Sequence, residues 1–156
     1  MTAELRLLAR TELGALSKVH AECFPADPWS VLDFMELLTI RGASGHIAVS
    51  ADGIEGFMLD LVGPEDAEIL TIGVAPRARR RGLARMLIGD LARRARHKGA
   101  RRLLLEVAAD NTSAIALYIS TGFVLLGERP HYYRRPEGNA DAFIFAMILP
   151  SMPNPG

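Results

Sequence analysis

An arginine-rich segment that ends in small residues is the strongest candidate for a binding site. Residues 74–84 are Val-Ala-Pro-Arg-Ala-Arg-Arg-Arg-Gly-Leu-Ala, which predicts the end of a strand, a loop, and a helix that starts at Gly82. The first turn of a helix exposes unpaired N–H groups and the positive end of its dipole. Because Gly82 and Ala84 carry almost no side chain, a phosphate can approach this backbone.

Two better-defined phosphate motifs are excluded for this segment. It lacks the Gly-Lys-Ser/Thr ending of a Walker loop and two of the three glycines of a dinucleotide fingerprint. What remains is an anion-binding loop in the general sense, or a basic, solvated loop whose glycine serves only the turn.

A carboxylate that interrupts an apolar strand is the second candidate. Residues 103–107 are Leu-Leu-Leu-Glu-Val, with Glu106 on the opposite side of the strand from its apolar neighbours. Partial burial of this carboxylate would suit it to proton transfer. The alternatives are an ion pair with one of the many arginines, or an edge position in water.

Two further polar residues fall on a predicted helix over residues 112–121. Tyr118 shares a helical face with Ala114 and Ile115, a pattern more typical of a core tyrosine than of a catalyst. Its phenol could nevertheless donate a proton to a sulfur anion. Asn111 is most simply the N-cap of this helix.

Adjacent aromatic residues after Pro130 suggest a binding surface. Tyr132 and Tyr133 lie in a polar segment that we predict to be a loop, although one ring could instead fold back over the sheet. Cys23, the only cysteine, is predicted to be a buried small apolar residue. The four histidines have no metal-like spacing, so we expect no metal site.

These candidates must be positioned by an alternation of strands and helices along one domain. Strands are predicted over residues 5–9, 46–51, 54–62, 67–74, 102–108, 123–127 and 142–149, and helices over 12–24, 29–38, 82–97 and 112–121. This order predicts an α/β fold around one sheet. We expect the domain to span residues 1–149, and residues 150–156 to form a flexible tail because they contain three prolines and a glycine.

Composition limits the partners of the protein. The formal net charge of the 156 residues is zero, but residues 77–102 hold eleven Arg or Lys and one acid, Asp90, which favours a local anionic partner. The arginines at 93, 94, 96, 101 and 102 are predicted to form a solvated face, and nucleic-acid binding is not favoured because no aromatic platform accompanies them. The sequence has no membrane-length apolar run and no signal-peptide pattern, so we expect a soluble, cytoplasmic protein.

Together, these motifs resemble the GNAT superfamily of acetyltransferases. Residues 79–84 match its Gln/Arg-x-x-Gly-x-Gly/Ala acyl-CoA loop, and residues 105–107 and 111–123 are similar to its later motifs. The resemblance is closer to the RimI-type branch, which acetylates the N-terminal alanine of a small-subunit ribosomal protein. The residues that are similar to this branch include Pro28-Trp29-Ser30, Tyr132-Tyr133, Asp141-Ala142 and Met147.

The resemblance implies a fold, a reaction and a set of site residues. It implies a mixed, mostly antiparallel sheet flanked by helices, with acetyl-CoA as co-substrate and no metal. It implies acetyl transfer to a protein N-terminal α-amine by direct attack, with Glu106 as general base and Tyr118 as general acid. The remaining implied roles are cofactor binding by Ile72, Val74, Arg79, Arg80, Arg81, Gly82, Leu83, Ala84, Asn111 and Tyr118, and substrate binding by Trp29, Tyr132 and Tyr133.

Two positions depart from the pattern of the family or branch, and two other functions stay open. Ala84 replaces the commoner glycine, which the family pattern accepts. Thr71-Ile72-Gly73 replaces the Asn-Ile-Ala usual in the branch, so Gly73 could loosen the strand or alter the substrate side. The alternatives are a GNAT enzyme for a small-molecule amine and an acyl-CoA-binding module without catalysis. The oligomeric state is not indicated.

Overall fold

The apolar stripe predicted over residues 82–97 forms helix α3 (Leu83–His97), which buries Leu87, Leu91 and Ala95 against the sheet. Gly82 precedes it with a φ of 78°, in the left-handed region that glycine adopts without a steric penalty. Helix α4 (Thr112–Thr121) is capped by Asn111, whose side chain accepts a hydrogen bond from the Ala114 N–H at 3.2 Å. The predicted cap and helix are therefore confirmed.

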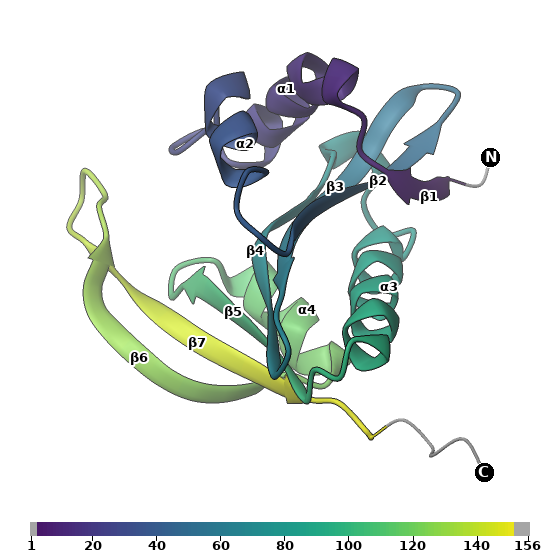
Figure 1. Ribbon diagram of the computed structural model, residues 1–156. Helices are drawn as coiled ribbons and strands as arrows, with labels where there is room; N and C mark the ends of the chain where they lie inside the picture. The colour runs from purple at the N-terminus through teal and green to yellow at the C-terminus, as the bar shows by residue number, and fades with distance from the viewer. Residues whose placement is uncertain (1–2, 152–156) are drawn as a thin grey trace, which may run out of the picture.

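The computed structural model describes residues 3–151, which form seven strands and four α-helices (Figure 1). The other elements are β1 (Glu4–Leu7), α1 (Leu13–Cys23), α2 (Val31–Leu37), β2 (Ala43–Ser50), β3 (Gly53–Val62), β4 (Asp66–Val74), β5 (Arg102–Ala108), β6 (Val124–Tyr133) and β7 (Ala140–Ile148). Most of the predicted tail, residues 152–156, lies outside the described part.

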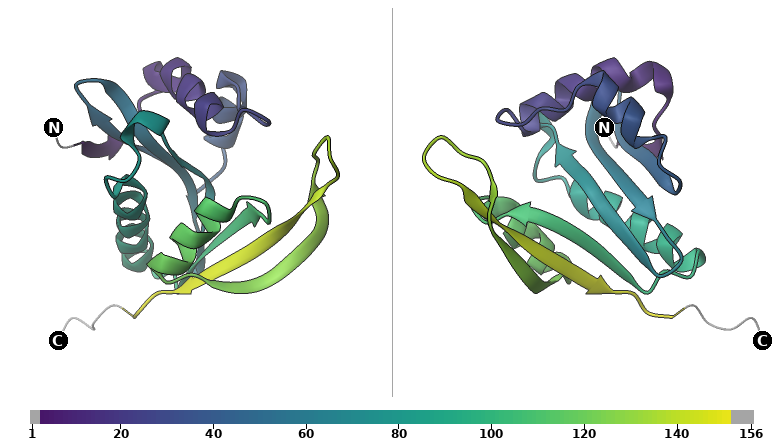
Figure 2. Two further views of the ribbon diagram at one scale, coloured as in Figure 1. Left: turned by 180° about the vertical axis from the view of Figure 1, so that it is seen from behind. Right: turned by 60° about the vertical axis from the view of Figure 1, so that its left-hand side comes forward.

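The strands form one mixed sheet in the order β1-β2-β3-β4-β5-β7-β6. Every neighbouring pair is antiparallel except β4 and β5, which are parallel. Helices α1 and α2 cover one face of the sheet and α3 and α4 the other, as the two views of Figure 2 show. The α/β class and the mostly antiparallel sheet are confirmed.

Strands β4 and β5 separate halfway along their length. Their pairing begins at Asp66 with Arg102 and ends at Ile69 with Leu105. Beyond these residues the two strands diverge (Figure 1), so the edge of β4 that faces β5 has no strand partner there. The backbone N–H and C=O groups on that edge need other hydrogen-bond partners. The fold thus opens a gap in the centre of its own sheet.

Gly73 is required by the close approach of Phe57 on the neighbouring strand. The two residues pair across β3 and β4. A Cβ atom at Gly73 would lie 2.6 Å from Phe57 Cζ and 3.1 Å from Cys23 Sγ. The phenyl ring of Phe57 is fully buried and has little room to move. Phe57 therefore occupies the space that a methyl group at residue 73 would need.

We expect Gly73→Ala to lower the free energy of unfolding by about 1–3 kcal/mol, because it overpacks the site. Thermal or urea unfolding measures the change. Gly89→Ala is the matched control, since a Cβ at Gly89, inside α3, meets no atom within 4 Å and should stabilise the helix. An unchanged stability in Gly73→Ala would contradict this account of the departure.

Arg94 does not belong to a solvated face, contrary to the sequence prediction. Its guanidinium donates to both oxygens of Asp60, which is completely buried, at 3.2 and 2.9 Å. Its Nε donates to Asp90 Oδ2 at 2.8 Å. Ser44 donates a further hydrogen bond to Asp60 at 3.0 Å. Arg94 thus supplies the counter-charge of a buried carboxylate and fixes α3 to β3.

Candidate active site

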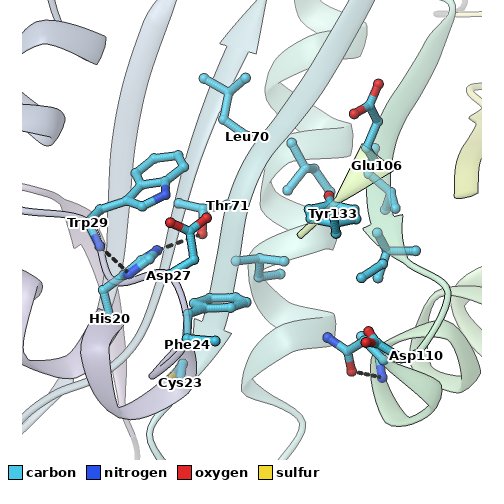
Figure 3. Close-up of a pocket in the computed structure, with 18 of the residues that line it drawn as sticks. His20, Cys23, Phe24, Asp27, Trp29, Leu70, Thr71, Glu106, Asp110 and Tyr133 are labelled. Carbon is cyan, nitrogen blue, oxygen red and sulfur yellow. Dashed lines mark hydrogen bonds between the residues drawn. The ribbon is translucent and has the colours of Figure 1, made fainter. Parts of the chain in front are cut away.

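The gap between β4 and β5 opens into a central chamber of about 480 Å³ (Figure 3). Leu70, Thr71 and Ile72 of β4 form one wall, and Glu106, Val107 and Ala108 of β5 face them. The segment between α1 and α2 and the start of α4 complete it. The divergence of two strands therefore makes the site, and the residues on both walls come from their unpaired halves.

Two further chambers, each about 570 Å³, adjoin the central one. The loop chamber lies beside the arginine-rich loop and shares Ile72, Asn111 and Tyr118 with the central chamber. The hairpin chamber lies beside the end of β6 and shares Glu106 and Tyr133 with it. A cleft with two different entrances can bring two substrates together at its middle.

Glu106 lies where the central and hairpin chambers meet. The alternation of β5 buries Leu105 and Val107 and turns Glu106 to the other face, where its side chain is 26% exposed. Its Oε1 lies 3.3 Å from Arg129 of β6. The ion pair left open by the sequence is present, and the carboxylate also lines the cleft.

Tyr118 lies where the central and loop chambers meet, across the cleft from the hairpin end. It is 7% exposed, and its ring packs edge-on against Phe123 with 5.8 Å between centroids. Burial raises the pKa of the phenol above its ordinary value, with a smaller contribution from Tyr133. The tyrosine is therefore a core residue that also lines the cleft, and it retains its proton at neutral pH.

Two side chains of the arginine-rich loop, Arg79 and Arg81, contact other groups of the protein. Arg79 Nε donates to the carbonyl of Val74 at 3.1 Å, and Arg81 pairs with the buried Glu55 at 3.3 Å. Arg79 and Arg80 line the loop chamber together with Gly82, Leu83 and Ala84, whereas Arg81 does not. The side chain of Arg81, which the resemblance places among the cofactor-binding residues, therefore contacts Glu55 and does not line this chamber.

His20 of α1 contributes to the cleft wall in a way that the sequence did not indicate, although the resemblance had named its neighbour Trp29 as a substrate-binding residue. His20 is 1% exposed and accepts a hydrogen bond from the Trp29 N–H at Nδ1, 3.1 Å away, while its Nε2 lies 3.2 Å from Thr71 Oγ1 (Figure 3). Burial lowers the pKa of His20 to about 4. The indole of Trp29 stacks on the neutral imidazole at 5.1 Å. His20 thus ties Trp29, which lines the central chamber, to β4.

Tyr132 and Tyr133 end strand β6, so the prediction of a loop is wrong. Arg129 pairs with Ala142 and Tyr133 with Ala140, which leaves residues 130–132 bulged opposite Asp141. His131 takes a φ of 55° in this bulge. Both tyrosines line the hairpin chamber, with ring centroids 5.2 Å apart, and Tyr133 reaches the central chamber.

Other titratable residues of the cleft carried no recognisable sequence signal. Glu68 lines the hairpin chamber, and burial together with the charge of Glu106 raises the pKa of its carboxyl. Arg135 pairs with Asp110 at 3.1 Å and lies over the ring of Tyr133.

Cys23 was predicted to be a buried core residue, but it is half-buried and lines two chambers. Burial raises the pKa of its thiol, which disfavours a nucleophilic thiolate.

Two kinds of feature are absent from residues 3–151. No helix there is long and apolar enough to cross a bilayer. No group of three or more His, Cys, Asp or Glu side chains in the same part of the chain is arranged to hold a metal ion.

Comparison with known proteins gives matches over nearly the whole chain. Residues 13–123 match the model of the acetyltransferase (GNAT) family. The [ribosomal protein bS18]-alanine N-acetyltransferase of Salmonella typhimurium is 34% identical over 145 residues, which cover 93% of this chain and 97% of that protein. The enzyme of the same name from Escherichia coli K12 is 38% identical over 142 residues, covering 91% and 95%.

A solved structure matches this chain over a similar share of its length. The crystal structure of the ribosomal-protein-S18-alanine N-acetyltransferase from Escherichia coli has a TM-score of 0.87 and 30% sequence identity to this chain. The match covers 99% of this chain and 97% of that one. The diverging strands and the cleft therefore lie in a region of shared architecture.

Proposed function

We propose that this chain, which belongs to the acetyltransferase (GNAT) family, acetylates the N-terminal α-amine of a protein. The chain is an acetyl-CoA-dependent N-acetyltransferase. The observation that carries the finer proposal is the cleft of three adjoining chambers, in which Glu106 lines the central and hairpin chambers and Tyr118 lines the central and loop chambers. The catalytic domain is assigned to residues 1–149.

Acetyl-CoA enters by the loop chamber. The unpaired N–H groups at the start of α3, from Gly82 to Ala84, receive the pyrophosphate, and Arg79 and Arg80 add positive charge. The edge of β4 without a strand partner offers backbone groups of Ile72 and the N–H of Val74, whose carbonyl already accepts from Arg79, to the amides of the pantetheine arm. Asn111 lies along the same path between the loop and central chambers.

The acceptor amine enters by the hairpin chamber as an ammonium ion, which is not a nucleophile. Glu106 removes one proton, directly or through a water molecule, and the free amine attacks the thioester carbonyl. A backbone N–H of β4 near Val74 stabilises the negative oxygen of the tetrahedral intermediate. The nitrogen of the intermediate then loses a second proton as the C–S bond breaks.

Tyr118 delivers its proton to the departing sulfur. The second proton lost from nitrogen restores the phenol, so the products are an N-acetyl peptide, CoA thiol and one proton. The phenol of Tyr118 is protonated at neutral pH, so it has a proton to donate to the sulfur.

The proposed acceptor is a ribosomal protein that begins with alanine. The support is the activity for which the relatives are named, since they match this chain at 34% and 38% identity over most of its length. Trp29, Tyr132 and Tyr133 border the central and hairpin chambers and give an extended peptide aromatic surfaces to lie against. Since ribosomal proteins are made in the cytoplasm, the proposal places the enzyme there.

The proposal is tested by comparing kcat/KM for an alanine-first peptide, for alanine amide and for spermidine. We expect the peptide to exceed alanine amide by at least about tenfold, because alanine amide has the same α-amine but no chain to contact the aromatic surfaces. Equal or faster turnover of spermidine would favour the small-amine alternative. Acetyl-CoA binding with no turnover of any amine would favour the non-catalytic alternative.

Tyr118→Phe should lower kcat by about 10²-fold or more while the fold is retained, because only the hydroxyl that serves the leaving sulfur is lost. The phenylalanine ring can keep the edge-on contact with Phe123. Steady-state kinetics and a thermal melt measure the two effects. Tyr133→Phe is the matched control, since Tyr133 also lines the central chamber. If Tyr133→Phe is the inactive variant instead, the general acid is misassigned.

A further inference from the structure

Glu55 is a buried carboxylate to which the reaction gives no task. It lies on β3, 2% exposed, between Ile54 and Gly56. Its Oε2 receives a hydrogen bond from Arg81 at 3.3 Å, while its Oε1 is enclosed and contacts no hydrogen-bond donor within residues 3–151. An ionised carboxylate in such surroundings needs a specific reason to be there. Its charged partner Arg81 belongs to the arginine-rich loop.

The loop backbone around Arg81 is unusual on both sides. Arg80 has a φ of 67° and Gly82 a φ of 78°, so two left-handed residues flank Arg81. This conformation is unfavourable for a residue with a side chain, such as Arg80. It persists only if contacts around it hold the chain in place. The turn also sets the direction of the N–H groups at the start of α3.

Arg77, near the start of the loop, also bonds to the beginning of β3. Arg77 donates to the carbonyl oxygens of Ile54 at 3.1 Å and Asp52 at 3.3 Å, in and beside the hairpin that leads into β3. The carbonyl of Glu55 itself accepts a hydrogen bond from the Ala75 N–H at 2.8 Å. The start of β3 therefore accepts hydrogen bonds from both ends of the arginine-rich loop.

We infer that Glu55 is a positioning residue for acetyl-CoA, which holds Arg81 and thereby fixes the phosphate-binding turn between Arg80 and Gly82. In this arrangement Arg81 contributes to binding through its contact with Glu55 and not by touching phosphate. Its absence from the lining of the loop chamber agrees with this role. Because an ion pair whose arginine side chain is 52% exposed adds little net stability, we expect the contact to matter for the geometry of the turn.

The inference is tested by a double-mutant cycle on the affinity for acetyl-CoA, measured by calorimetric titration without an acceptor. We expect Glu55→Gln and Arg81→Gln each to raise the Kd by about tenfold, since each removes one charge-assisted hydrogen bond. The double variant should bind no more weakly than either single variant, because both changes break one contact. It also leaves no unpaired buried charge, so it remains informative if a single variant fails to fold.

Two results would overturn the inference. If Arg81 binds phosphate directly, Glu55→Gln releases it, and the Kd stays the same or falls while Arg81→Gln still raises it. If the double variant binds acetyl-CoA as the wild type does, the contact positions nothing. Arg93→Gln is the matched control for loss of a positive charge, because Arg93 lies on the exposed side of α3, paired with Asp90 and outside the chambers. These outcomes do not depend on which amine is acetylated.

Discussion

Glu106→Gln is expected to lower kcat by about 10²- to 10⁴-fold at neutral pH, with the Kd for acetyl-CoA unchanged. Glutamine keeps the shape of the side chain but cannot accept the proton of the ammonium ion. Glu106 lies in the central and hairpin chambers and not in the loop chamber, so the variant leaves the donor site intact. Peptide acetylation and calorimetric titration measure the two quantities.

The pH dependence makes this prediction specific to a base. As the pH rises, a growing fraction of the acceptor amine is already deprotonated, so the defect of Glu106→Gln should shrink. Glu68→Gln is the matched control, since Glu68 is the neighbouring carboxylate of the hairpin chamber. A defect that is the same at every pH, or a larger one in Glu68→Gln, would mean that Glu106 is not the general base.

Arg94→Met is expected to lower the free energy of unfolding by about 3–5 kcal/mol, because it leaves the carboxylate of Asp60 buried without a counter-charge. Asp60 has no exposed surface, and Arg94 is its hydrogen-bonded cation at both oxygens. Urea unfolding monitored by circular dichroism gives the change. In the double variant Asp60→Leu/Arg94→Met, most of the loss should be recovered, since neither charge remains.

Arg93→Met is the matched control for this change. Arg93 is adjacent to Arg94, also pairs with Asp90, and has a side chain that is 65% exposed. A solvent-exposed pair contributes about 0–1 kcal/mol, so this variant should unfold almost as the wild type does. Equal losses in Arg93→Met and Arg94→Met would show that burial of the Asp60 pair does not matter.

The elements that depend on local patterns were predictable from the sequence. The strand over residues 102–108 has the predicted bounds, and the start and end of α4 follow from Asn111 and Gly122. Apolar periodicity and caps act within one element, so no knowledge of distant neighbours is needed. The positions of Glu106 and Tyr118 in one cleft followed only from the family resemblance.

Features that depend on distant contacts were not predictable. Arg81 and Arg94 have the same residue type and similar surroundings in the sequence as their neighbours, and only Glu55 and Asp60 on β3 distinguish them. The bulge at residues 130–132 extends β6 past Pro130, where a turn signal predicted a loop. His20 has its role because Thr71, 51 residues away, lies beside it.

The most direct test of the central claim is to incubate the purified protein with acetyl-CoA and a peptide that begins with alanine and contains an internal lysine. Tandem mass spectrometry then locates the acetyl group. The account predicts acetylation of the α-amine alone, and none when the N-terminal alanine is blocked beforehand. Acetylation of the lysine side chain, or no acetylation while acetyl-CoA binds normally, would contradict it.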